Sequence, residues 1–346
     1  MTKRLLAGTV TTALLAALLT AAGLAQPALA CACGAPAPLV GASVSVGEEH
    51  AIVTFDGEIE RIEMTLDMLT EAAETGLVVP TPTPATVSLG DARLFTALDR
   101  QTAPAEIVSE DWWSTSEDNL NAGGAPTVLS QVDLGPITAV TLSASDAEGL
   151  ASWLDENGYG IDPAVRELFA DYVDRGWSFA ALKLAGEEKL DGRLDPVRFD
   201  FATSEVVYPL LLSRLSPRAQ TVRLYLFGAD GMQATFPDGT VAGDVTWAGP
   251  VTQPSLALLG DYLTVVEAHF TEPAAQITGD LAITSTGTRP DHIPTVTRTK
   301  HVEVGGIPLG IAIVGVGSIF GLMVVLVVVG AIIHRVGERR RSRMLY

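Results

Sequence analysis

The chain has 346 residues and carries 22 Lys and Arg against 41 Asp and Glu, a formal net charge of −19. Two basic residues lie near the N-terminus and five near the C-terminus, so the region between them holds 15 basic and 40 acidic residues. A net charge near −25 makes nucleic acid and anionic lipid poor partners for this region. Such a charge favours binding of a cation or a basic protein. Alternatively, it only keeps the protein soluble through repulsion between copies.

Residues 1–30 have the pattern of a signal peptide. Lys3 and Arg4 precede an apolar stretch, and Ala28-Leu29-Ala30 is a small-x-small cleavage site. We expect cleavage after Ala30, which makes Cys31 the first residue of the mature chain. Lipid attachment to Cys31 is an alternative, although the order of Ala28 and Leu29 is the reverse of the usual lipoprotein signal.

Cys31 and Cys33 are the two cysteines of the chain. We expect a disulfide between them in an oxidising compartment, although their spacing reaches the upper limit of disulfide geometry when the backbone is extended. The alternatives are lipidation, a redox pair, or a metal site in which both thiolates bind Cu(I) or Zn. No further Cys pair and no His pair is present to complete a zinc site, and no cofactor is predicted.

The first predicted strands form a hairpin. Asp56-Gly57 separates two apolar runs, residues 51–55 and 58–66, and this dipeptide is a strong signal for a tight turn between antiparallel strands. Residues 76–80 predict another strand, which runs into a segment stiffened by prolines at 80, 82 and 84.

An acidic segment, residues 105–127, follows a short helix that we expect Asp91 to cap. We predict a long loop there, and loops of this length within a compact domain are usually functional or disordered. Its adjacent Trp112 and Trp113 are candidate binding residues for a sugar, a peptide or lipid headgroups. The alternative is that one of the two rings packs onto the domain.

Two further helices are predicted from their end signals. The first begins at the capping box Ser145-Asp146-Ala147-Glu148 and ends at Asn157-Gly158. The second begins at Asp162-Pro163 and ends at Gly176. Each carries an apolar stripe at helical spacing, so we expect both helices to cover one face of an antiparallel sheet.

Alternating apolar residues predict strands at 177–181 and 197–201, and other strand-like runs predict the remaining strands, at 127–134, 137–142, 206–212, 221–227, 243–247, 262–270 and 281–285. The predicted fold class is therefore α+β: an antiparallel β-rich ectodomain over residues 31–285 with two or three short helices packed on the sheet, plus one C-terminal transmembrane helix.

Several spaced motifs belong together: Cys-x-Cys-Gly after the leader, Pro80 to Pro84, Leu89-Gly90-Asp91 with Leu94-Phe95, Trp153-Leu154 with Asn157-Gly158-Tyr159, Gly176-Trp177, Leu194-Asp195-Pro196, Phe201-Ala202-Thr203-Ser204 and Tyr208-Pro209-Leu210. As a set they resemble the bacterial exported-protein family catalogued as domain of unknown function 2330. The likeness covers about residues 31–228, and residues 229–285 are expected to add β structure. The resemblance implies an exported bacterial protein, commonly with a C-terminal span, and it brings no catalytic residues.

The C-terminal region predicts a membrane anchor. Residues 286–306, rich in Thr and Pro, are expected to form a stalk. Residues 307–333 contain no charged side chain, and at about 1.5 Å per residue they exceed the ~30 Å hydrocarbon core. The tail, residues 334–346, holds five arginines, which favour the cytoplasmic side. We therefore expect a bacterial cell membrane protein with its large domain outside.

The sequence contains no common catalytic or phosphate-binding motif, and its histidines are not paired at metal-ligand spacing. We therefore predict a non-enzymatic envelope protein whose acidic ectodomain binds another envelope protein or a cation, or serves a structural role. One alternative is a thiol-dependent metal-binding or redox protein that uses Cys31 and Cys33. Another is a sugar-binding module that uses Trp112 and Trp113.

Overall fold

The computed structural model describes residues 34–40, 42–114, 131–132, 138–142, 147–160, 162–186 and 189–342. The chain divides into two compact units. We call the first, residues 1–103 and 128–293, the body, and the second, residues 104–127 and 294–346, the anchor unit. Each unit is described by itself.

The centre of the body is the predicted hairpin, now seen as β2 (Ser45–Phe55) and β3 (Ile59–Leu69). In its turn the Asp56 carboxylate accepts hydrogen bonds from the backbone N–H groups of Glu58, at 3.0 Å, and Ile59, at 2.8 Å. These bonds occupy two donors that the strand ladder leaves free. The hairpin prediction is confirmed.

A nine-stranded sheet is built around this hairpin, with the order β15-β16-β13-β2-β3-β10-β7 and with β11 joining β3 to β5. Its other strands are β5 (Thr86–Leu89), β7 (Gln131–Val132), β10 (Gly192–Leu194), β11 (Val197–Ala202), β13 (Gln220–Gly228), β15 (Asp244–Pro250) and β16 (Tyr262–Phe270). Most pairs are antiparallel, as predicted, but β13 runs parallel to β2 and β10 parallel to β7. The sheet is therefore mixed.

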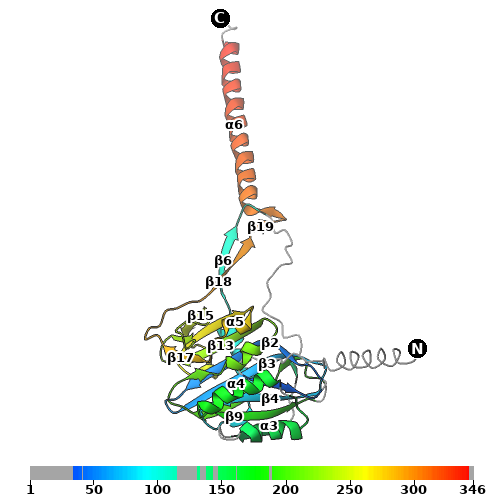
Figure 1. Cartoon of the computed structure of the whole chain (residues 1–346). Coiled ribbons are helices and arrows are strands. Elements are labelled where there is room, and N and C mark those ends of the chain that lie inside the picture. The colour runs from blue at the N-terminus through cyan, green and yellow to red at the C-terminus, as the bar shows by residue number, and fades with distance from the viewer. Residues whose placement is uncertain are drawn as a thin grey trace, which may run out of the picture. The chain divides into compact units, whose positions relative to one another are not determined.

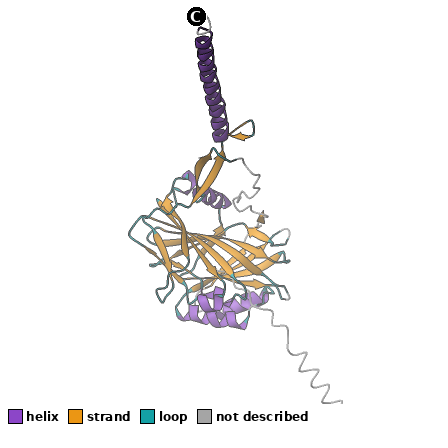
Figure 2. Ribbon diagram, turned by 90° about the horizontal axis from the view of Figure 1, so that it is seen from above, coloured by secondary structure: helices purple, strands orange, loops and turns teal. Residues whose placement is uncertain are grey.

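A four-stranded antiparallel sheet of order β1-β4-β9-β8 lies between the nine-stranded sheet and two helices. Its strands are β1 (Ala35–Pro38), β4 (Glu74–Thr81), β8 (Thr138–Leu142) and β9 (Ser178–Ala185). Alternate residues of β4 face opposite sides: Leu77 and Val79 join the core between the sheets, whereas Val78 packs under the helices. Figure 2 shows helices on one face of the stacked strands.

Those two helices are α3 (Ala147–Glu156) and α4 (Pro163–Asp174), and they lie beside β4 and β9 (Figure 1). Asp162 caps α4 by accepting the Ala164 N–H at 2.8 Å, as predicted. The packing of both helices on one antiparallel sheet is confirmed. The capping box predicted at residues 145–148 falls mostly outside the described residues.

The far face of the nine-stranded sheet is covered by α2 (Ala92–Gln101) and the short 3-10 helix η2 (Pro254–Leu256). Asp91 caps α2 as predicted, because its carboxylate accepts the Arg93 N–H at 3.0 Å. Phe95 and Leu98 of this helix pack against Ile52 and neighbouring residues of the sheet.

A small third sheet, β12-β17-β14, closes the body together with α5 (Pro273–Gln276). Its strands are β12 (Val207–Tyr208), β14 (Met232–Thr235) and β17 (Leu281–Ser285). The strand predicted over 206–212 is too long, because β12 ends at Tyr208 and the 3-10 helix η1 (Leu211–Leu215) begins three residues later. The Asp280 carboxylate accepts the N–H groups of Leu210 and Leu211, at 2.8 and 2.9 Å, so these donors do not pair with a strand.

The anchor unit contains a parallel two-stranded ribbon, β6 (Ala105–Asp111) with β18 (Thr295–His301). A hairpin, β19 (Glu303–Val304) with β20 (Ile307–Pro308), follows it, and then helix α6 (Leu309–Ser342). The loop prediction is thus wrong for 105–111. Both strands are exposed and polar, so neither has the one-sided pattern from which a strand is recognised in sequence.

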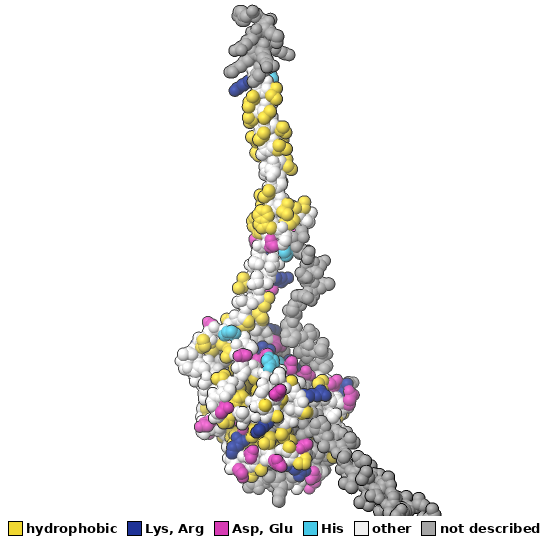
Figure 3. Space-filling view, turned by 45° about the horizontal axis from the view of Figure 1, so that its top comes forward, with side chains coloured by type: hydrophobic (Ala, Val, Ile, Leu, Met, Phe, Trp, Pro, Cys, Tyr) yellow, Lys and Arg dark blue, Asp and Glu magenta, His cyan; other side chains and the backbone are white. Residues whose placement is uncertain are grey.

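Helix α6 has a stretch, Leu309–Arg335, that is long and apolar enough to cross a membrane, and its most apolar 18 residues, with a mean hydropathy of 2.8, are not buried. Hydrophobic side chains surround it in Figure 3. Acidic side chains are spread over the drawn surface of the body rather than gathered in one patch (Figure 3).

We expect Phe169→Ala to lower the free energy of unfolding by about 3–5 kcal/mol, because the ring is 5% exposed and packs edge-on against Phe179 at 5.1 Å. Urea denaturation of the full chain in detergent micelles measures this change. Glu167→Ala, on the exposed side of the same helix, is the control and should stay within about 0.5 kcal/mol. Equal effects of the two substitutions would contradict the packing.

Candidate functional site

A pocket of about 320 Å³ opens in the body between helix α2 and strands β3 and β10. Its lining residues are Thr65, Ala92, Arg93, Phe95, Thr96, Asp99, Arg193, Leu194 and Pro196. The volume is in the range of small-ligand sites, and apolar and polar side chains alternate in the wall. Two of these residues, Arg93 and Arg193, place positive charge in an otherwise acidic domain.

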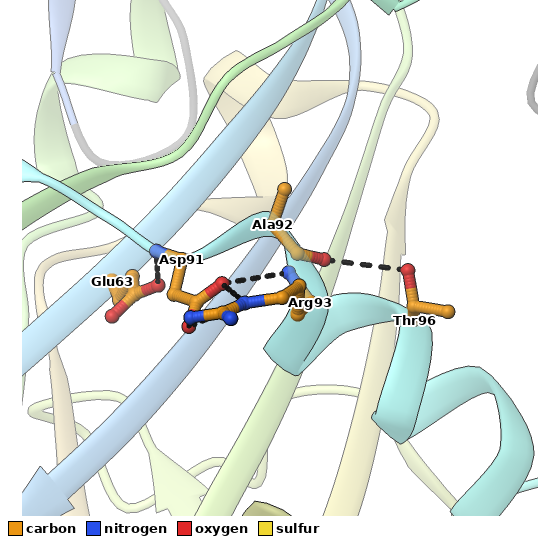
Figure 4. A network of polar contacts seen from close by, with 5 residues as sticks. All are labelled: Glu63, Asp91, Ala92, Arg93 and Thr96. Carbon is orange, nitrogen blue, oxygen red and sulfur yellow. Dashed lines mark hydrogen bonds and ion pairs between the residues drawn. The ribbon is translucent and has the colours of Figure 1, made fainter.

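The wall on the side of α2 is held by a buried carboxylate (Figure 4). Glu63 of β3 accepts the Asp91 N–H at 2.6 Å, and the Gly90 N–H donates to the carbonyl of Pro196 at 2.7 Å. A Cβ on Gly90 would lie 2.7 Å from both Glu63 Oε1 and Pro196 Cβ, so no larger residue fits there without displacing one of them. Burial raises the pKa of Glu63, although the Asp91 N–H opposes this. The helix start is thereby fixed against the sheet.

The opposite wall is made by Leu194 and Arg193 of β10. The Thr65 hydroxyl donates to the Leu194 carbonyl at 2.6 Å, which ties β10 to the floor of the pocket. Three motifs that carry the family resemblance, at residues 89–91, 94–95 and 194–196, therefore meet at this pocket. From sequence these motifs indicated the family and, through Asp91, a helix start, but nothing local indicated that they come together.

The two arginines of the pocket differ in their partners. Arg93 is exposed and forms an ion pair with its neighbour Asp91, at 2.7 Å. Arg193 is half-buried, and within the described part of the chain no carboxylate forms an ion pair with it. Its charge adds to the lowering of the pKa of Glu48, for which the His50 hydrogen bond is the largest cause, and it opposes the rise that burial gives to the pKa of Asp67. Arg193 is thus the guanidinium in this pocket that is available to a ligand.

A second buried carboxylate of β3, Glu60, was not singled out from sequence. Its side chain is fully buried, Oε2 accepts the Val207 N–H at 3.1 Å, and Oε1 has no hydrogen-bond partner among the described residues. Burial raises its pKa to about 8, and the Val207 hydrogen bond only partly opposes this shift. Glu60 does not line the pocket, so we interpret it as a structural residue that remains protonated at neutral pH.

Neither Trp112 nor Trp113 is among the residues that line this pocket. Cys31 and Cys33 lie outside the described residues, so their disulfide, metal and lipid alternatives stay predictions. Trp112 and Trp113 lie in the anchor unit, directly after β6, and are 41% and 65% exposed. Among the described residues, no group of three or more His, Cys, Asp or Glu is arranged to hold a metal ion.

The fold and the pocket define a β-rich domain with a ligand-sized cavity, joined along the chain to a helix that is able to cross a membrane. The chain belongs to the bacterial family described as "Uncharacterized protein conserved in bacteria (DUF2330)", whose model matches residues 27–284. The family was recognised from its motifs in the sequence. The match extends beyond residue 228, so residues 229–284 are part of the family domain as well.

Comparison with solved structures gives a match to the crystal structure of baculovirus P35, with a TM-score of 0.33 and 8% sequence identity. It covers 56% of this chain and 67% of that chain. No curated protein matches the chain.

We expect the stability of the protein to depend on pH through Glu60. Between pH 4.5 and about 8 the folded state keeps a proton that the unfolded state has lost, so the free energy of unfolding falls as the pH rises. The stabilising contribution is complete below pH 4.5 and is lost by about pH 8, with a slope of up to about 1.4 kcal/mol per pH unit. Glu60→Gln should make this slope clearly shallower, because the amide does not ionise, and the part that remains comes from Glu63 and Asp67, whose pKa values burial also raises.

Urea denaturation of the full chain in micelles across this pH range measures the slope. The matched control is Glu58→Gln, an exposed position on the same hairpin, which should keep it. If the wild-type and Glu60→Gln proteins show the same pH dependence, Glu60 does not titrate as described.

Proposed function

We propose that the chain is a single-span protein of the bacterial cell envelope, whose body lies outside the cytoplasm and works as a binding module. The signal-peptide pattern of residues 1–30, the apolar stretch of α6 and the arginines after it support this topology. In this proposal the leader is removed after Ala30 and the tail, residues 334–346, is cytoplasmic.

The observation that carries the binding role is the half-buried Arg193 in the wall of a small-ligand-sized pocket. A guanidinium with no ion-pair partner is suited to a carboxylate or phosphate, because its fork of N–H donors matches the two oxygens of such a group. Helix α2 and β10 hold the walls in place, so a ligand meets a largely preformed site. We propose that an envelope partner presents an anionic group to Arg193.

An anionic group is favoured over the cation that the acidic composition suggests. Arg193 is half-buried in the wall, whereas Asp99, the carboxylate among the lining residues, is exposed, and the acidic residues on the face drawn in Figure 3 are dispersed. Dispersed carboxylates attract cations only weakly at physiological ionic strength, because charges more than about 8 Å apart are screened.

The topology predicts which parts of the protein a protease can reach. Protease added to spheroplasts should digest the body and leave a fragment that contains α6 and an epitope tag placed after Tyr346. Detergent should then expose the tag to digestion, which is the control for protection by the membrane. A body that resists protease until the membrane is dissolved would contradict the proposed orientation.

The pocket predicts stabilisation by a simple anion. Inorganic phosphate, used as the probe, should raise the free energy of unfolding of the full chain in micelles by about 1.4 kcal/mol at tenfold its dissociation constant. Arg193→Gln should abolish the effect. Thermal or urea unfolding at constant ionic strength, with chloride replacing phosphate, measures it.

The control for Arg193 is Arg218→Gln, which removes the same charge from an exposed arginine that forms no ion pair within the described part of the chain. This variant should keep the response to phosphate. An equal loss in both variants would show that phosphate acts through net charge, and no response in the wild type would remove the anion proposal.

A further inference from the structure

The anchor unit brings two tryptophans to the first turn of helix α6, although they precede it by nearly 200 residues in sequence. Ribbon β6–β18 has seven residue pairs, which span roughly 20 Å, and it ends at the pair of Asp111 with His301. Trp112 and Trp113 follow at once. The Val302 N–H donates to the Asp111 carbonyl at 2.9 Å, and the Leu309 N–H donates to the Val302 carbonyl at 2.8 Å.

The tryptophan turn is bonded directly to the helix. The Gly310 N–H donates to the Trp112 carbonyl at 2.6 Å. A Cβ on Gly310 would lie 2.8 Å from ring atoms Cδ2 and Cε3 of Trp113, so the indole packs on the bare backbone of α6. The helix position occupied by Gly310 therefore accommodates the ring.

The turn itself is held by Asp111. Its carboxylate accepts the backbone N–H of Trp113 at 2.8 Å and that of Ser114 at 3.3 Å, and it also accepts the Ser114 hydroxyl. These donors hold the pKa of Asp111 below its usual range, with the Ser114 hydroxyl as the largest cause. Trp112 Nε1 donates to Glu110 at 3.2 Å. The rings are thus fixed in place but remain 41% and 65% exposed.

The length of the apolar part of α6 indicates the depth at which these rings lie in a bilayer. Its 27 residues are about 40 Å long at ~1.5 Å per residue, whereas the hydrocarbon core of a bilayer is ~30 Å thick. With the span centred in the bilayer, about 5 Å of the helix projects at each end, so the first turn, with Gly310, lies at the headgroup level. Indole rings favour this level, because the ring is apolar and its N–H is a hydrogen-bond donor.

We propose that Trp112 and Trp113 insert into the membrane–water interface beside α6, so that phospholipid headgroups and the first acyl carbons are their ligand. The protein is then held by its span and by a second, non-covalent contact from a distant part of the chain. This inference rests on α6 spanning the membrane, which belongs to the proposed function.

Fluorescence quenching tests the proposal with the full chain reconstituted in phosphatidylcholine vesicles. Lipids brominated high on the acyl chain, next to the headgroup, should quench the wild type more than lipids brominated near the chain end. The variant Trp112→Phe with Trp113→Phe should lose this quenched component. Its remaining tryptophans, Trp153, Trp177 and Trp247, all lie in the body and act as an internal control.

Gly310→Ala keeps both tryptophans but displaces the Trp113 ring, so we expect weaker quenching and a red shift of the emission. Gly317→Ala is the matched control, because a Cβ there meets no described atom within 4 Å, and it should behave as the wild type. Extraction of the vesicles with alkaline carbonate tests the span separately.

The outcomes separate the two ideas. If the protein stays in the vesicles after carbonate but its quenching does not depend on Trp112 and Trp113, the interface contact is overturned and the span is supported. Protein that is extracted by carbonate overturns the span itself. Equal quenching in the Gly310→Ala and Gly317→Ala variants would show that the position of the Trp113 ring does not depend on its contact with Gly310. The assigned geometry would then be wrong.

Discussion

The carboxylate of Asp280 joins three parts of the body that are distant in sequence. It accepts the hydroxyl of Tyr172 at 2.7 Å and a guanidinium N–H of Arg175 at 2.8 Å, both from the helix α4 region, and the two backbone donors that start η1. A carboxylate buried to 7% exposure is stable only with such partners. The Arg175 guanidinium also lies over the rings of Tyr172 and Trp177, at 4.3 and 4.5 Å. The helices and the small third sheet therefore depend on one side chain.

This connection explains why residues 229–284 belong to the family domain. Asp280 and strand β17 lie in that stretch, and β13, β15 and β16 are neighbours in the nine-stranded sheet. From sequence the same stretch looked like additional β structure of lesser resemblance. Its strands at 262–270 and 281–285 were predicted with the bounds that the structure shows, because they are apolar runs between Gly and Pro residues. The strands with which they pair were not predicted.

Local signals in the sequence were reliable where the chemistry is local. Asp56-Gly57, Asp91 and Asp162 act on backbone groups two or three residues away, so their roles could be predicted without knowledge of the fold. The candidate site could not be predicted in this way. Arg193 and helix α2 are about 100 residues apart in sequence. Arg193 is a candidate binding residue because it is half-buried and has no ion-pair partner among the described residues, and both properties arise only in the assembled sheet.

The ribbon of the anchor unit was missed for a related reason. Strands β6 and β18 are exposed on both faces, contain no buried residue, and pair in parallel across 190 residues. An isolated two-stranded ribbon of this kind has little stability of its own, so its order depends on how its ends are held. One end is fixed by the Asp111 turn and its bonds to Val302 and Gly310, and the chain enters the other end at Pro104 and Pro294. The start of α6 therefore stabilises the ribbon as well as anchoring the chain, which makes the contact between the tryptophan turn and the helix the structural centre of this unit.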